Sequence, residues 1–153
     1  MATRRRVLLI YVKSSIKCIF ADTDHEVLWA DVKPRRLPRG FSNIIVGMVY
    51  QPPDANDVTK RDYLLSCLES LEARYPNCAF VLAGDFNRSL LPLIHSVVKA
   101  FHLKPVVDFP TRGDRTLDQI FTNISEYFST TSQSTPFGLS YHQTVSYEVW
   151  PPS

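Results

Sequence analysis

The middle of the sequence alternates between strand-like and helix-like segments, and this alternation limits the fold more than any other feature. Residues 43–50 form a continuous apolar run rich in β-branched side chains, which is typical of a strand. Residues 58–75 then place apolar side chains three and four positions apart, as one face of a helix requires. Residues 78–83 return to the pattern of a buried strand. This order predicts an α/β fold in which helices lie outside the sheets.

Further strands and a second helix are expected around this central part. The strand-like runs cover residues 7–13, 26–32, 117–122 and 144–150, and the second helix covers residues 90–101. For the first helix, Asp57 is the expected N-cap and Pro76 follows its end. Its apolar stripe consists of Tyr63, Leu64, Leu65, Cys67, Leu68 and Leu71.

The length and composition of the chain are those of one globular domain. The chain has 153 residues, of which 44% are hydrophobic and 21% are charged, so a core of ordinary size can form. No stretch approaches the ~18 uncharged apolar residues that a membrane span needs. Arg4–Arg6 before an apolar run resemble the start of a signal peptide, but Lys13 and Lys17 interrupt that run. We therefore expect neither secretion nor a membrane anchor.

The three cysteines, Cys18, Cys67 and Cys78, are odd in number and lack the spacing of a structural zinc site. A reducing intracellular compartment is the simpler interpretation, with nucleus and cytoplasm left open. The net charge of +2 is too small to require nucleic acid as a partner. Basic residues do cluster at 4–6, 33–39 and 112–115; for a single cluster a solvated loop is favoured over a phosphate contact.

The candidate chemistry follows the strand at residues 80–83, which runs into Gly84, Asp85, Phe86 and Asn87. A carboxylate and a carboxamide two residues apart point to the same side of a sheet. Such a pair can accept a proton from water and donate to a developing oxyanion. The same residues also suit a simple turn after a strand, so the tetrapeptide alone leaves both interpretations open.

Four segments in the right order resemble one known group of enzymes. Gly84–Asn87 resembles the GDxN signature of the endonuclease/exonuclease/phosphatase superfamily, and Val49–Pro53 is similar to its strand that ends in Tyr before proline. Phe109–Arg112 followed by Thr116–Asn123 resembles the "PTR…LDxIxTN" segment of endonucleases from non-LTR retrotransposons, the type associated with reverse transcriptase. Gly138–His142 stands in the place of the terminal "SDH" motif.

The resemblance implies an α/β sandwich of two sheets flanked by helices. It implies phosphodiester hydrolysis in DNA, assisted by Mg²⁺ or Mn²⁺. We expect residues 7–150 to form a partial domain of this kind, and residues 1–6 to be a basic N-terminal extension.

The resemblance also implies roles for five side chains. Asp85 would orient or deprotonate the attacking water, and Asn87 would help to hold the phosphoryl group. His142 would stabilise charge on that group, with Asp118 fixing its ring and favouring the imidazolium. Tyr50 would donate a hydrogen bond to a phosphate oxygen. We expect these residues to converge at one end of the sandwich.

Thr111 and Arg112 would lie on a loop that touches the nucleic-acid backbone, because the arginine fork suits phosphate geometry. Alternatives that do not involve function exist for some residues of the set. Tyr50 also suits a half-buried aromatic at a strand end, and His142 a polar surface residue. The other histidines, His25, His95 and His102, are interpreted as structural or solvated.

Two departures from the family pattern bear on metal binding. Family members begin with a segment that carries an Asn and then a strand that ends in a metal-binding Glu, and no segment here corresponds. We therefore expect a domain that is incomplete at its N-terminus. Tyr141 stands where the family has an Asp, and a protonated phenol is a poor ligand for a hard cation. The ligands for the metal stay unassigned.

These observations lead to three hypotheses. The first is a retroelement-derived nuclease domain with impaired or no hydrolysis. The second is a working nuclease or phosphatase that completes its site from another chain. The third is a non-catalytic module that binds nucleic acid or protein. We also expect self-association through an unpaired sheet edge near Val7–Val12, where strands of the family pattern are missing.

Overall fold

The structure is a computed structural model, and it describes residues 16–34, 36–128, 131–134 and 144–146. The expected strand at residues 7–13, the basic segment 1–6 and the motif at residues 138–142 lie outside the described residues.

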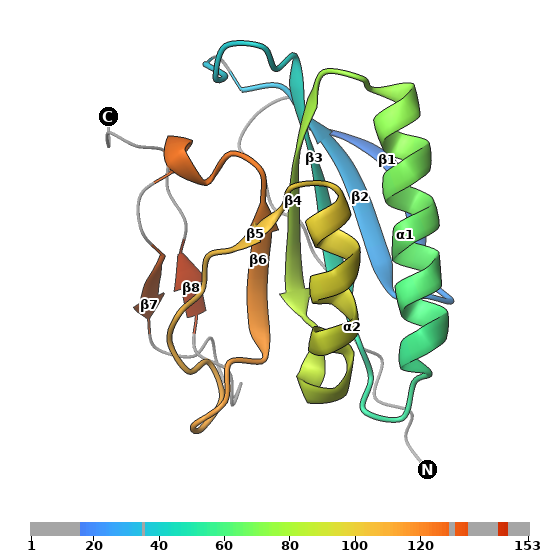
Figure 1. Ribbon diagram of the computed structural model, residues 1–153, viewed down its shortest axis with the longest axis vertical. Coiled ribbons are helices and arrows are strands. Elements are labelled where there is room, and N and C mark those ends of the chain that lie inside the picture. Colours follow the sequence, from blue (N-terminus) through green and yellow to red (C-terminus); the bar gives the residue numbers. More distant parts are fainter. Residues whose placement is uncertain (1–15, 35, 129–130, 135–143, 147–153) are drawn as a thin grey trace.

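Six strands form one central sheet, in the order β1-β2-β3-β4-β6-β5 (Figure 1). Their bounds are β1 (Ile16–Asp22), β2 (Val27–Val32), β3 (Asn43–Tyr50), β4 (Cys78–Asp85), β5 (Lys104–Pro105) and β6 (Asp118–Thr122). Among the strands of the described residues, only β3 and β4 pair in parallel, and they are joined by the helix α1 (Asp57–Arg74). All other neighbours in this sheet are antiparallel.

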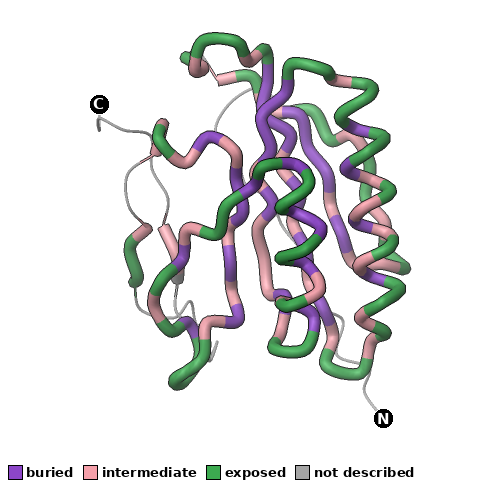
Figure 2. Tube along the Cα trace, viewed as in Figure 1, coloured by how far each residue is buried: buried purple, intermediate pink, exposed green. Residues whose placement is uncertain are grey.

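Two helices cover one face of this sheet, as Figure 1 shows for α1 and for α2 (Asn87–Ala100). Buried positions alternate with exposed ones along both helices (Figure 2), and apart from Lys60 the buried residues of the two helices are apolar. The core beneath them contains Leu64, Leu68 and Leu71 of α1, Leu90 and Ile94 of α2, and Trp29, Ile45, Phe80 and Leu82 of the sheet. This cluster contains most of the buried apolar side chains of the described residues, and each fully buried aliphatic or aromatic one contributes about 1.5–3 kcal/mol.

A second, two-stranded sheet covers part of the opposite face. It consists of β7 (Ser132–Ser134) and β8 (Thr144–Ser146). Val145 of β8 lines a pocket of about 170 Å³ together with Met48, Ala83 and Ile120, which come from β3, β4 and β6. The 3₁₀ turn Ser125–Tyr127 lies between β6 and β7. Sheet packs on sheet here, which confirms the expected α/β sandwich.

The strand β1 and the start of α2 differ from the sequence-based expectation. The strand β1 was not expected because Lys17, Cys18 and Phe20 are exposed, so this edge strand shows no apolar periodicity. The helix α2 begins at residue 87 rather than 90, because Asn87 itself starts its first turn.

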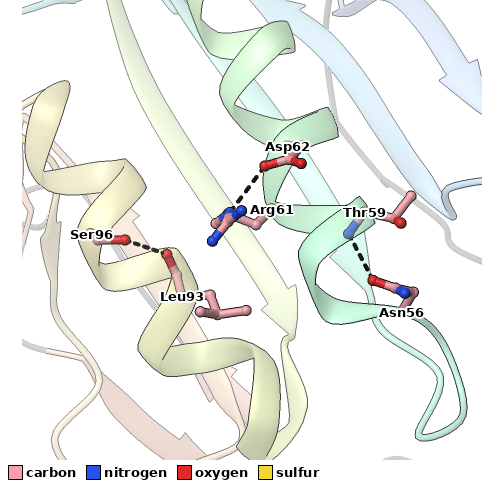
Figure 3. Close-up of polar contacts among 6 residues, drawn as sticks. All are labelled: Asn56, Thr59, Arg61, Asp62, Leu93 and Ser96. Atoms are coloured by element: carbon pink, nitrogen blue, oxygen red, sulfur yellow. Dashed lines mark hydrogen bonds and ion pairs between the residues drawn. The ribbon is translucent and has the colours of Figure 1, made fainter.

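The cap of α1 also differs from the expectation. Asn56, and not Asp57, is the N-cap: its Oδ1 accepts a hydrogen bond from the Thr59 amide at 3.0 Å (Figure 3). The carboxylate of Asp57 is occupied elsewhere, since its Oδ1 accepts from Gln51 Nε2 at 3.0 Å.

Gly84 allows β4 to run close to β3. Its φ is +145°, and a Cβ built there would lie 1.8 Å from the Val49 carbonyl oxygen. We predict that Gly84→Ala lowers the free energy of unfolding by more than about 4 kcal/mol, the range of severe core defects. Gly40→Ala is the matched control, because Gly40 also has a positive φ, +96°, but has no atom within 4 Å of the added Cβ. The control should cost about 1–2 kcal/mol. Urea denaturation measures the free energy of unfolding of both variants. Losses of similar size would contradict the prediction, because they would show that the backbone shifts to relieve the clash with the Val49 carbonyl.

Candidate functional site

Three polar side chains form a row across neighbouring strands at one end of the central sheet. Tyr50, the last residue of β3, pairs with Asp85, the last residue of β4. Asp85 pairs in turn with Asp118, the first residue of β6. Residues that pair directly across strands project to the same face of a sheet. The row therefore faces the side on which the second sheet lies, and all three residues are partly buried.

The topology explains why these residues meet. Because β3 and β4 are parallel, their carboxyl ends lie at the same edge of the sheet. Because β6 is antiparallel to β4, its first residue lies at that edge too. The "LDxI" segment thus supplies Asp118 at the point where the GDxN segment supplies Asp85. These residues are far apart in the sequence and adjacent in the sheet.

Asn87 joins this row through the turn that follows β4. Its amide N–H donates to Asp85 Oδ1 at 3.1 Å, and its φ is +48°, in the left-handed region that asparagine tolerates. Its Oδ1 accepts from the backbone amides of Ser89 and Leu90 at 3.0 and 3.2 Å, so it caps α2. Its Nδ2 lies 3.4 Å from the Gln51 carbonyl oxygen. Asn87 is therefore a turn residue, and the same turn holds the Asp85 carboxylate.

The backbone on each side of Tyr50 is held by three other segments. The Tyr50 amide donates to the Glu26 carbonyl at 3.1 Å, and the Tyr50 carbonyl accepts from Lys60 Nζ at 3.1 Å. The next amide, that of Gln51, donates to the Asp85 carbonyl at 2.9 Å. Tyr50 is thus fixed by the β1–β2 turn, by α1 and by β4.

Thr111 is fully buried, and its hydroxyl is turned into the protein. The Oγ1 atom accepts from the amides of Leu117 and Asp118, at 3.1 and 3.0 Å. Both amides belong to the segment that leads into β6, so Thr111 fixes the backbone of Asp118. In this structure the Thr111 hydroxyl accepts hydrogen bonds from the segment before β6. Its expected contact with a nucleic-acid backbone stays a prediction.

Arg112 lies at the start of a tight hairpin next to the site. The amides of Thr111 and Arg112 both donate to the Arg115 carbonyl, and the Arg115 amide donates back to the Arg112 carbonyl at 3.0 Å. Gly113 adopts a φ of +59° at the tip. Arg112 and Arg115 are exposed. An open pocket of about 490 Å³ lies between this hairpin and the start of α2, and Arg88 and Arg115 line it.

The structure therefore brings together Tyr50, Asp85, Asn87 and Asp118, with the hairpin that carries Arg112 alongside. The place of His142 lies outside the described residues, so its contact with Asp118 stays a prediction. The catalytic roles of the other residues stay predictions as well.

The described residues do not form a complete metal centre. Asp85 and Asp118 supply two carboxylates, but no three His, Cys, Asp or Glu side chains of the described ranges are grouped to hold an ion. A hard cation such as Mg²⁺ takes about six oxygen ligands from carboxylates, carbonyls, waters and substrate phosphates. The two carboxylates would be at most part of such a shell.

Sequence reasoning missed two buried polar residues beside the site, Gln51 and Lys60, which are 1% and 4% exposed. Lys60 lies four residues before Leu64, so it falls on the apolar stripe of α1. A cation at that position of the stripe was the available signal.

Comparison with known proteins gives likeness in structure alone. No protein-family model matches the chain, and no curated protein matches it. The solved endonuclease domain of TRAS1, a telomere-specific non-LTR retrotransposon, is similar over 90% of this chain and 70% of that one, with a TM-score of 0.65 and 10% identity.

Two further solved structures are similar. One is the cytolethal distending toxin of Haemophilus ducreyi, with a TM-score of 0.56, 13% identity, and coverage of 91% of this chain and 59% of that one. The other is the human Nocturnin catalytic domain with bound sulfate, with a TM-score of 0.55, 15% identity, and coverage of 86% and 60%. The chain thus spans about three fifths of the length of these two proteins.

We predict that the Thr111 oxygen is needed to place Asp118. Thr111→Val leaves the buried Leu117 amide and the partly buried Asp118 amide without this acceptor, at about 1–3 kcal/mol for an unsatisfied buried group. Thr111→Ser keeps the oxygen and loses one methyl group, which should cost about 0.5–1.5 kcal/mol. Urea denaturation measures the losses, and amide exchange at Asp118 should be faster in the valine variant only. Equal behaviour of the two variants would contradict this role.

Proposed function

Because the chain has the endonuclease/exonuclease/phosphatase type of fold, we propose that it carries a phosphodiester-handling site for DNA, of the retroelement endonuclease kind and with weak hydrolysis. The observation that supports this most is the row of Tyr50, Asp85 and Asp118 in register across β3, β4 and β6. These are the positions that the sequence motifs select, and they meet at one edge of the sheet.

The proposed chemistry assigns one task to each side chain. The Asp85 carboxylate orients the attacking water and accepts its proton. The Tyr50 hydroxyl and Asn87 Nδ2 donate hydrogen bonds to phosphate oxygens, where charge develops, and for this Asn87 Nδ2 gives up its long 3.4 Å contact with the Gln51 carbonyl oxygen. His142 adds a positive charge at the same place, and Asp118 holds its ring in orientation.

Exposed arginines beside the row give the proposed path of the DNA backbone. Arg112 and Arg115 project from the hairpin, and Arg88 lies in the first turn of α2 across the open pocket. Guanidinium groups bind phosphate oxygens in pairs and do not lose their charge near neutral pH. The three arginines can therefore hold a strand while Asp85 faces one of its phosphates.

A divalent cation, Mg²⁺ or Mn²⁺, is the cofactor that the sequence resemblance implies; when bound it would stabilise charge on the phosphoryl group. The described carboxylates supply only part of its ligand shell. Tyr141 replaces the further carboxylate that the motif would provide. We therefore propose that the cation binds weakly and that hydrolysis is slow.

The incomplete ligand set also supports a second candidate function, a DNA-binding module without catalysis. In this case the arginines still bind phosphates, and the row of polar residues only lines the contact. Metal-dependent cleavage separates the two functions, since both include DNA binding.

We predict that the purified chain gives at most a trace of Mg²⁺-dependent nicking of supercoiled plasmid, whereas a non-catalytic module would give none. Loss of metal assistance removes several kcal/mol of charge stabilisation, and ~1.4 kcal/mol corresponds to tenfold in rate. Tyr141→Asp should tighten Mn²⁺ binding, measured by calorimetry, and give at most a trace of nicking. Strong nicking by the unchanged chain that is abolished by Asp85→Asn would instead establish a working nuclease, and gel filtration would show whether a second copy completes its site.

We predict that DNA binding depends on the arginines beside the site. Arg112→Ala and Arg115→Ala together should weaken binding of a short duplex and reduce the slope of log affinity against log salt by about two. Arg74→Ala is the matched control, because Arg74 is also exposed but lies in the last turn of α1. Fluorescence anisotropy across a salt series measures all variants. An unchanged salt slope in the double variant would remove the hairpin from the contact.

A further inference from the structure

Lys60 is a buried cation that the proposed chemistry does not use. It lies on the inner face of α1 with Leu64 and Leu68, and only 4% of its surface is exposed. Lysine is almost never fully buried unless it is paired. Its Nζ donates to the carbonyl oxygen of Tyr50 at 3.1 Å.

The groups around Lys60 are mostly acceptors. Glu26, in the β1–β2 turn, and Asp22, the last residue of β1, attract the ammonium, and Asp57 lies three residues earlier on α1. Glu26 Oε2 and Gln51 Oε1 are buried and accept no hydrogen bond in the structure. A positive charge among buried acceptors offsets part of the cost of burying them.

Three further titratable groups, those of His25, Tyr63 and Cys67, lie on the same elements as these residues. The ring of His25 stacks on that of Tyr63 at 3.9 Å, with 4° between the planes, and His25 Nδ1 lies 3.1 Å from Asp22 Oδ2. Burial raises the pKa of the Tyr63 phenol well above its usual value, and also raises the pKa of the Cys67 thiol.

The carbonyl that Lys60 binds belongs to the peptide unit between Tyr50 and Gln51. The other edge of the same planar unit, the Gln51 N–H, donates to the carbonyl of Asp85 at 2.9 Å. One rigid plane is therefore held by α1 on one side and by β4 on the other. Its orientation sets where Tyr50 lies relative to Asp85.

We propose that Lys60 is a positioning residue: its ammonium holds the Tyr50–Gln51 peptide against Asp85 and so sets the geometry of the candidate site. An effect of Lys60 on DNA binding rests on the proposed function, whereas its hydrogen bond to the Tyr50–Gln51 peptide does not. Lys60 touches no reacting atom and acts through Tyr50.

The charge of Lys60 makes this hold depend on pH. Burial lowers the pKa of Lys60 from its ordinary 10.5 to about 8, although Glu26 and Asp22 oppose the shift. Below pH 8 the Lys60 ammonium donates a strong hydrogen bond to the Tyr50 carbonyl. Above pH 8 the neutral amine is a weaker donor, and the Glu26 carboxylate loses the positive charge near it. Between pH 8 and 10.5 the folded chain binds fewer protons at Lys60 than the unfolded chain, so this group makes stability rise with pH there. The charge thus orders the site at a cost in stability.

The test follows the Gln51 amide by ¹⁵N NMR from pH 6.5 to 9.5 in the full chain. In the unchanged protein its shift should titrate with a midpoint near pH 8. Lys60→Arg, which stays charged, should abolish this midpoint. Lys60→Met should show the alkaline signal at every pH and exchange the Gln51 amide about tenfold faster. Arg61→Met is the matched control, because Arg61 is the next cation of α1 and pairs at the surface with Asp62 (Figure 3); it should leave the midpoint unchanged.

A Gln51 amide that does not titrate near pH 8, or that titrates equally in Lys60→Arg, would overturn the proposal. If Lys60→Met does not fold, the comparison of the unchanged protein with Lys60→Arg still tests the proposal. Anisotropy of a short duplex over the same pH range then tests the link to the site: binding should weaken above pH 8 in the unchanged chain and persist in Lys60→Arg. A chain that binds no DNA while its Gln51 amide titrates would refute the proposed function and leave the role of Lys60 in place.

Discussion

The parallel contact between β3 and β4 is the constraint on which the rest of the structure depends. It brings two carboxyl ends to one edge of the sheet and leaves α1 to cross back over a single face. Gly84 permits the close approach, because any side chain there would meet the Val49 carbonyl. The candidate site is built directly on this contact. Tyr50 and Asp85 end the two strands, and β6 then adds Asp118 from the other side.

Much of this arrangement could be predicted from local pattern. The apolar runs at residues 43–50 and 78–83 and the helical spacing between them are strong signals, because each element buries one continuous face. The motif at Gly84–Asn87 located the end of β4, and the expected meeting of Tyr50, Asp85 and Asp118 agrees with the strand register. These features could be predicted because each depends on residues that are near one another in the sequence.

Other features depended on contacts that no local pattern carries. The edge strand β1 has an exposed surface, so only its pairing with β2 defines it. The inward turn of the Thr111 hydroxyl follows from the path of the loop before β6, which the residue type does not reveal. The burial of Lys60 follows from tertiary packing, and its place on the apolar stripe of α1 was the local signal that pointed to it. Burial of a polar group is decided by the whole fold, and this is where sequence reasoning stops.

The shared peptide plane between Tyr50 and Gln51 also has an evolutionary consequence. Lys60 binds this rigid unit through its side chain, whereas Asp85 binds it through its backbone carbonyl, so the contact constrains the residue type at position 60 and not at position 85. A lineage that loses the cation at position 60 would be expected to change the acidic partner at position 26 in the same step. Where the site has no remaining use, this linked pair should be among the first to decay, since burying its charges then brings no benefit.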